Sequence, residues 1–202
     1  MATKVDLRRE LRQFYTAKRL PGVVEVPELA FVAIDGHGDP NTSEDYREAV
    51  SALFSVSYAA RFALKRAGVI DFGVMPLEGL WWATDMSAFS IADKSAWDWT
   101  MLIVQPDEVT ADVFAAAKDK AAAKVPRAAL ERLRLERLAE GLAAQVLHVG
   151  PYSAEGPTVV SLHAFVAEQG RELAGKHHEV YLGDPRRSAP EKLKTIIRQP
   201  MR

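Results

Sequence analysis

Two short segments combine acidic and aromatic residues at a spacing that suits acid–base chemistry or the binding of a cation. The first is Glu78-Gly79-Leu80-Trp81-Trp82. Side chains alternate between the two faces of a β-strand, so Glu78 and Trp82 share one face and Trp81 lies on the other. A carboxylate beside an indole could bind a cation or act as an acid or base. Alternatively, the tryptophans fill the core and Glu78 lies at a strand end.

The second segment is His177-His178-Glu179-Val180-Tyr181, where alternation puts His177, Glu179 and Tyr181 on one face. The Glu179 carboxylate either faces solvent or is buried for a purpose, and we favour burial. If Glu78 and Glu179 reach one pocket, each carboxylate raises the proton affinity of the other. One could then act as an acid and the other as a base. An ionised pair inside an aromatic wall would instead suit a flat, cationic ligand.

Other chemistry-bearing residues give weaker signals. Tyr152 follows a Gly-Pro pair at the end of an apolar strand, so its hydroxyl either reaches a cavity mouth or belongs to a packed ring. His177 and His178 are adjacent on a strand and point to opposite faces, so they cannot chelate one metal together. The other histidines are scattered, and the chain has no cysteine. We therefore expect neither a metal site nor a cofactor.

Composition narrows the class of protein. The chain has 202 residues, 48% of them hydrophobic, and a formal net charge of -1, which fits one compact domain without a general attraction for nucleic acid. No stretch approaches the roughly 20 apolar residues of a transmembrane helix, and the N-terminus lacks the apolar run of a signal peptide. Together with the absence of cysteine, this predicts a cytoplasmic protein with no membrane partner.

The order of predicted elements repeats. The first part reads as a short helix, a strand, a long helix and an antiparallel pair of strands, at residues 4–19, 29–34, 43–68, 76–85 and 97–104. The second part reads as two amphipathic helices, then a strand, a helix and two strands, at residues 109–121, 127–140, 144–149, 156–169, 177–182 and 193–197. Basic residues over the final loop and strand favour a solvated edge; they are Arg186, Arg187, Lys192, Lys194, Arg198 and Arg202.

This order predicts an α+β fold in which two strand-helix-strand-strand units join their sheets and place both long helices on one side. The units span residues 28–105 and 142–202. Residues 1–27 form an N-terminal extension, and residues 106–141 form a helical connection between the units. The sequence does not fix whether the protein is a monomer or a homodimer.

Several motifs together resemble the stand-alone GyrI-like small-molecule-binding proteins. They are Val26-Pro27, FVAIDGHGDPN at 31–41, PLEGLWW at 76–82, VGPY at 149–152, HEVYL at 178–182, and the segment 184–195. The resemblance covers nearly the whole chain. It implies two tandem β-α-β-β modules of the SHS2 type in a pseudo-twofold antiparallel assembly, with a central ligand cleft between them. It also implies that Glu179, supported by Tyr181, lies in the ligand pocket.

One branch of these proteins is similar in its Glu-Gly-Leu-Trp-Trp motif and hydrolyses the cyclopropane of yatakemycin-type DNA-alkylating compounds. The resemblance therefore implies a hydrolase in which Glu78 or Glu179 orients water and Tyr152 donates to the developing phenol oxygen. Trp82 and Trp99 would sandwich the substrate, and the remaining binding residues would be Trp81, His177 and Tyr181. The alternative is a non-catalytic protein that sequesters flat aromatic or cationic small molecules.

Overall fold

The computed structural model describes residues 2–83 and 94–202. The first half of the chain contains β1 (Thr3–Val5), α1 (Leu7–Glu10), η1 (Arg12–Phe14), β2 (Gly22–His37), α2 (Glu44–Arg66), β3 (Ile70–Phe72), β4 (Glu78–Trp82) and β5 (Asp98–Gln105). The second half contains α3 (Ala111–Ala121), α4 (Arg127–Arg132), β6 (Arg134–Val149), η3 (Tyr152–Ala154), α5 (Gly156–Glu168), β7 (His177–Tyr181), η4 (Pro190–Lys192) and β8 (Lys194–Pro200).

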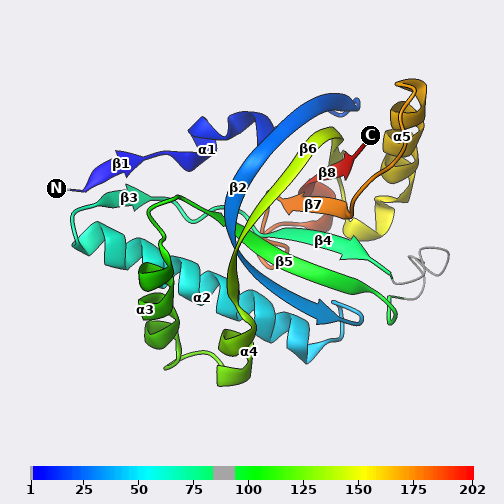
Figure 1. The fold of residues 1–202 in the computed structure, drawn as a ribbon. Coiled ribbons are helices and arrows are strands. Elements are labelled where there is room, and N and C mark those ends of the chain that lie inside the picture. The colour runs from blue at the N-terminus through cyan, green and yellow to red at the C-terminus, as the bar shows by residue number, and fades with distance from the viewer. Residues whose placement is uncertain (1, 84–93) are drawn as a thin grey trace.

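Within the described residues, antiparallel strands close a barrel in the order β2-β5-β4-β7-β8-β6 (Figure 1). The α+β prediction is confirmed. Each half of the chain supplies three neighbouring strands, β2-β5-β4 and β6-β8-β7, and the halves join where β2 pairs with β6 and where β4 pairs with β7. The β4–β7 seam therefore lies on a boundary between the two halves of the chain.

Helix α2 covers the outside of the barrel over β2 and β5 (Figure 1). The Ser43 side chain caps its first turn by accepting a hydrogen bond from the Tyr46 backbone N–H at 3.1 Å. Small and aliphatic residues, among them Ala49, Leu53 and Val56, recur at helical spacing and are fully buried. The second long helix, α5, lies over β6 and β8. Both helices thus pack on the outer face, as the repeat predicted, and among the described residues no helix could cross a membrane.

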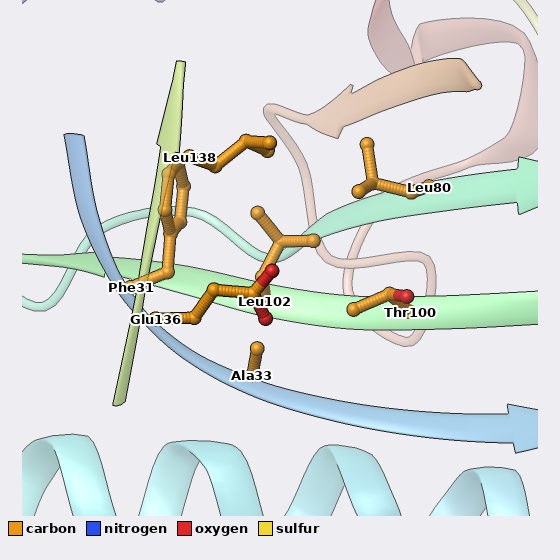
Figure 2. Close-up of a pocket in the computed structure, with 7 residues that line it drawn as sticks. All are labelled: Phe31, Ala33, Leu80, Thr100, Leu102, Glu136 and Leu138. Atoms are coloured by element: carbon orange, nitrogen blue, oxygen red, sulfur yellow. The ribbon is translucent and has the colours of Figure 1, made fainter. Parts of the chain in front are cut away.

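The inside of the barrel is packed with side chains. Figure 2 shows residues of β2, β4, β5 and β6 converging on a cavity of about 10 Å³, lined by Phe31, Ala33, Leu80, Thr100, Leu102, Glu136 and Leu138. Strands β4 and β6 are not neighbours in the barrel, so these residues meet in its interior. A space of this size holds about one water molecule. This cavity cannot contain a small-molecule ligand.

The predicted helix over 127–140 is wrong beyond Arg132. Leu133 is extended, and from Arg134 the chain enters β6, a 16-residue strand that pairs along β2. Leucines at 135 and 138 among charged residues are typical of an amphipathic helix. Pairing with β2 overrides this local preference. The strand predicted over 29–34 is correspondingly longer, because β2 begins at Gly22 and runs to His37.

The N-terminal segment is less helical than predicted over 4–19. It forms β1, which pairs in parallel with β3, followed by only one turn of α1 and the short η1. Arg198 of β8 donates to the Phe14 carbonyl oxygen at 2.7 Å, and Gln145 of β6 donates to the Gln13 carbonyl oxygen at 3.0 Å. These bonds hold the segment against barrel residues.

Arg198 also corrects the prediction of a solvated edge. Strand β8 has a neighbour on each side, and the Arg198 side chain is buried. It belongs to a buried ion network, defined here as Tyr15, Glu78, Glu140, His178 and Arg198. The Arg198 guanidinium lies 2.9 Å from Glu140, and the His178 imidazole lies 2.8 Å from Glu140 and 3.0 Å from Glu78. The Tyr15 hydroxyl donates to Glu78.

Charge balance makes this network tolerable in a buried setting. Burial alone would lower the pKa of His178, but Glu140 and Glu78 outweigh it and raise the pKa to about 9. Burial alone would raise the pKa of Glu140, yet His178 and Arg198 bring it down to about 2. At neutral pH the ionised Glu140 therefore faces the protonated His178 and Arg198, which satisfies the requirement that buried charges be paired.

This pairing predicts a pH dependence of stability. Because the folded state binds the His178 proton more tightly than the unfolded state, its contribution is complete below the ordinary pKa of 6.5 and is lost as the pH rises toward about 9. Urea unfolding of the wild type and of His178→Gln between pH 6 and 9.5 would measure it. The variant should be less stable overall, and its stability should decline less steeply over this window. Parallel declines in the two proteins would contradict the assignment.

Candidate functional site

A group of polar and aromatic residues lies on the outer face of the barrel at the β4–β7 seam. The register places Gly79 opposite Glu179 and Trp81 opposite both His177 and Trp99. Directly opposed residues point to the same face. The seam therefore gathers side chains from both halves of the chain.

Glu179 is the centre of a carboxylate cluster, defined here as Glu155, His177, Glu179 and Tyr181. The Tyr181 hydroxyl donates to Glu179 Oε2 at 2.7 Å, and His177 Nε2 lies 3.1 Å from Glu179 Oε1. Burial alone would raise the pKa of Glu179, but the hydrogen bonds of His177 and Tyr181 outweigh it, so the pKa lies below its ordinary value. Only 13% of the Glu179 side chain is exposed, so this carboxylate is ionised yet largely removed from water.

Glu155 is the neighbouring carboxyl group, and it is not among the site residues predicted from the sequence. It follows η3 and directly precedes α5, with its side chain buried beside Glu179. Burial, and then the charge of Glu179, raise the pKa of Glu155 to about 9. At neutral pH the two carboxyl groups therefore hold one proton between them, on Glu155. The signal in the sequence was an acidic residue at the start of a helix, three positions after Tyr152.

An aromatic wall, made of Tyr46, Trp81, Trp97, Trp99 and Tyr152, adjoins the carboxylate cluster. Tyr46, from the first turn of α2, packs its ring against Trp81 at 6.2 Å and against the edge of Trp99 at 5.3 Å. The Tyr152 ring meets the Tyr181 ring edge-on at 5.6 Å. Burial, and then the charges of Glu155 and Glu179, raise the pKa of Tyr152 to about 12. Its hydroxyl consequently remains a hydrogen-bond donor over the physiological range.

Trp99 occupies the wall because residue 36 on the paired strand is glycine. A Cβ at Gly36 would lie 2.1 Å from the Trp99 ring, so the ring fills the space of a missing side chain. Trp99 is completely buried, and among the described residues its indole Nε1 has no hydrogen-bond partner. Trp99 is therefore a buried member of the aromatic wall, in ring contact with Tyr46.

The structure does not bring Glu78 and Glu179 into one pocket. Glu78 lies opposite Val180 on the inner face, where Tyr15 and His178 contact its carboxylate. Alternation along β4, which the sequence predicted, is what separates it from Glu179 on the outer face. Glu78 belongs to the buried ion network and is away from the aromatic wall.

Trp82 and Trp99 are likewise on opposite faces, so the expected sandwich between them does not form. Trp82 shares the inner face with Glu78, and Lys176 lies over its ring, with the Nζ 3.1 Å from the ring centroid. The register pairs Trp99 with Trp81 instead. Of the residues predicted for the site, the seam gathers Trp81, Trp99, Tyr152, His177, Glu179 and Tyr181.

Comparison with known protein families agrees with this arrangement. The GyrI-like small molecule binding domain matches residues 21–202. The chain belongs to this family. The family resemblance inferred from the motifs is thereby confirmed. No curated protein matches the chain.

Solved structures that are similar to this chain extend the comparison. An uncharacterized conserved protein from Listeria innocua is 40% identical, with a TM-score of 0.91 over 98% of this chain and 100% of that one. A hydrolase from Listeria innocua is also 40% identical, with a TM-score of 0.89 over 99% of this chain and 100% of its own. The EcmrR C-terminal domain shares the fold, at 13% identity and a TM-score of 0.56 over 90% of this chain and 96% of its own.

Proposed function

We propose that this GyrI-like protein is a small-molecule hydrolase whose reaction takes place at the carboxylate cluster. The observation that carries the proposal is the pair of neighbouring carboxyl groups with pKa values pushed apart, Glu179 ionised and Glu155 protonated. Such a pair supplies a base and an acid at one pH. The similarity to a hydrolase over the full length of both chains supports the same class of reaction.

The proposed substrate is a DNA-alkylating compound in which a strained cyclopropane shares one carbon with a dienone ring, as the resemblance to the cyclopropane-hydrolysing branch implies. Glu179 accepts a proton from water while the water oxygen forms a bond to the cyclopropane methylene. The bond between that methylene and the ring carbon breaks, and its electron pair moves through the dienone to the carbonyl oxygen. That oxygen takes up a proton from solvent through the hydrogen bond of Tyr152 and becomes a phenol. Glu179 then releases its proton to solvent, so the net change is the addition of one water.

Tyr152 is the proposed donor to the developing phenol oxygen. Its pKa of about 12 keeps the hydroxyl protonated, and its contact with Tyr181 places it beside Glu179. A preorganised donor aimed at the atom where charge develops stabilises the transition state. Tyr46 and Tyr152, the partly exposed rings of the aromatic wall, would hold the flat substrate by ring contacts.

Glu155 gives this reaction an upper pH limit. Above its pKa of about 9 the pair loses its shared proton, and a second negative charge opposes the developing phenolate. We expect kcat of the wild type to fall as the pH rises through about 9 and this fall to be absent in Glu155→Gln. A pH series of initial rates measures it. The exposed residue Glu168 of α5 offers the control Glu168→Gln, and an unchanged alkaline fall in Glu155→Gln would contradict the assignment.

The second candidate function is sequestration of a flat cation without turnover. The observation that favours it is the ionised Glu179 carboxylate beside the aromatic wall, a combination that attracts cations through charge and ring faces.

A single incubation separates the two functions. A cyclopropane-bearing alkylator is supplied in excess over the protein, and the small molecules are then separated by chromatography. Hydrolysis predicts ring-opened product in amounts exceeding the protein. Quantitative recovery of unchanged compound, with tight binding measured by calorimetry, would favour sequestration and reject the hydrolase.

A further inference from the structure

Gly79 lies at the centre of β4, directly opposite Glu179 in the barrel register. A Cβ at this position would lie 2.7 Å from Trp81 Nε1 and 3.1 Å from the Tyr181 hydroxyl oxygen. The first distance is shorter than a side chain tolerates. Glycine inside a strand lowers sheet stability and often marks a place where another group approaches the backbone closely. Here two polar groups occupy the volume that a side chain would take.

Those two groups form a hydrogen-bonded chain that ends on Glu179. The Trp81 indole Nε1–H donates to the Tyr181 hydroxyl oxygen at 3.0 Å, and the Tyr181 hydroxyl donates to Glu179 Oε2 at 2.7 Å. With its oxygen accepting from the indole, the Tyr181 hydroxyl keeps its proton directed at the carboxylate. Chains of this kind strengthen their members because each bond polarises the next.

Packing fixes the first member of the chain. Trp81 is 4% exposed, its ring is stacked on Tyr46, and the edge of Trp97 meets it at 5.5 Å. An indole held on both sides cannot move away to admit a methyl group at residue 79. Any side chain at this position must therefore displace the indole nitrogen or the Tyr181 hydroxyl.

We propose that Gly79 and Trp81 are positioning residues for Glu179: the missing side chain admits the indole, and the indole fixes the Tyr181 hydroxyl on the carboxylate. The kinetic part of this inference rests on the proposed function, in which Glu179 is the base. It assigns a purpose to the glycine and the first tryptophan of the Glu-Gly-Leu-Trp-Trp motif. The Trp81 N–H is thereby committed to Tyr181 and is not free to bind substrate.

The proposal can be tested without substrate by NMR. The protein is labelled with ¹³C-glutamate, and the chemical shift of the Glu179 carboxyl carbon is followed as the pH changes. The Glu179 signal is assigned as the one that is missing in Glu179→Gln. The Tyr181 hydrogen bond is among the causes that lower the Glu179 pKa, so weakening it should raise this pKa. We expect an upward shift of roughly one pKa unit in Gly79→Ala. Trp81→Phe, which keeps a ring and removes the donor, should shift the pKa in the same direction by less.

The matched control is Gly73→Ala. Gly73 lies between β3 and β4, and a Cβ there would meet nothing within 4 Å. The Glu179 titration should be unchanged in this variant. An unchanged titration in both Gly79→Ala and Trp81→Phe would overturn the proposal, and Trp81→Phe decides alone if Gly79→Ala does not fold.

The kinetic counterpart is the acidic limb of the pH–rate profile. If Glu179 is the base, Gly79→Ala should move this limb to higher pH by the same interval as the NMR titration. An NMR shift without a matching kinetic shift would reject Glu179 as the base while leaving the positioning role intact. The two failures are therefore distinguishable.

Discussion

Replacing Glu179 with Gln should lower kcat by about 10²–10⁴-fold, the range in which a positioned general base contributes to catalysis. The amide keeps the size of the side chain and its contacts with Tyr181 and His177, but it cannot accept a proton from water. Initial rates of cyclopropane opening at neutral pH measure the effect. Binding of the intact substrate should persist, because the aromatic wall is unaltered.

The matched control is Glu78→Gln, one strand away and on the opposite face of the barrel. This substitution removes a charge from the buried ion network, where Tyr15 and His178 contact the carboxylate. We expect lower stability and an unchanged kcat for the folded protein. Equal loss of kcat in the two variants would contradict the division of roles between the outer and inner faces.

Replacing Arg198 with Leu should destabilise the protein by about 3–5 kcal/mol, the cost of leaving a buried charge without its partner. Arg198 is the cation closest to Glu140 after His178, and it also satisfies the Phe14 carbonyl. Its loss leaves Glu140 with His178 as its remaining cationic partner in the buried ion network and removes one hydrogen bond to the N-terminal segment. Urea unfolding at pH 7 measures the change.

Arg202→Leu serves as the comparison. Arg202 pairs with Glu172 near the C-terminus, and both side chains are about three-quarters exposed, at 76% and 77%. Exposed pairs contribute about 0–1 kcal/mol, so this variant should remain close to the wild type. If the two substitutions lowered the free energy of unfolding by similar amounts, the buried ion network would contribute no more to stability than an exposed ion pair, and the prediction would be wrong.

Strand alternation made the two faces of the site predictable from the sequence. Alternation predicted that Trp81 lies on one face of its strand and that Glu78 and Trp82 lie on the other. It also predicted that His177, Glu179 and Tyr181 share one face. The structure confirms both predictions. What alternation cannot supply is register. Only the pairing of Gly79 with Glu179 brings the Trp81 indole within hydrogen-bond distance of the Tyr181 hydroxyl and leaves Glu78 on the inner face. The sandwich of Trp82 and Trp99 therefore could not be tested without the structure.

Contacts between residues distant in the sequence account for the other differences between the predictions and the structure. Helix propensity in 134–140 favours a helix, and only the partner strand β2 makes the segment extended. Arg198 resembles a solvated basic residue until the barrel closes and brings Glu140 to it. No local sequence pattern identifies Glu155 as a site residue. Its raised pKa depends on burial and on Glu179, which is distant in the sequence. Local patterns predict elements, whereas pKa values and ion networks depend on closure of the barrel.

The most direct test of hydrolysis at the carboxylate cluster is the origin of the product oxygen. A cyclopropane-bearing alkylator is incubated in H₂¹⁸O, in excess over the wild-type protein, and the products are analysed by mass spectrometry. The proposed reaction predicts many ring-opened molecules per protein, each with one ¹⁸O on the former cyclopropane methylene, and background levels with Glu179→Gln. Unlabelled product, a stoichiometric covalent adduct on the protein, or equal labelling by Glu179→Gln would contradict it.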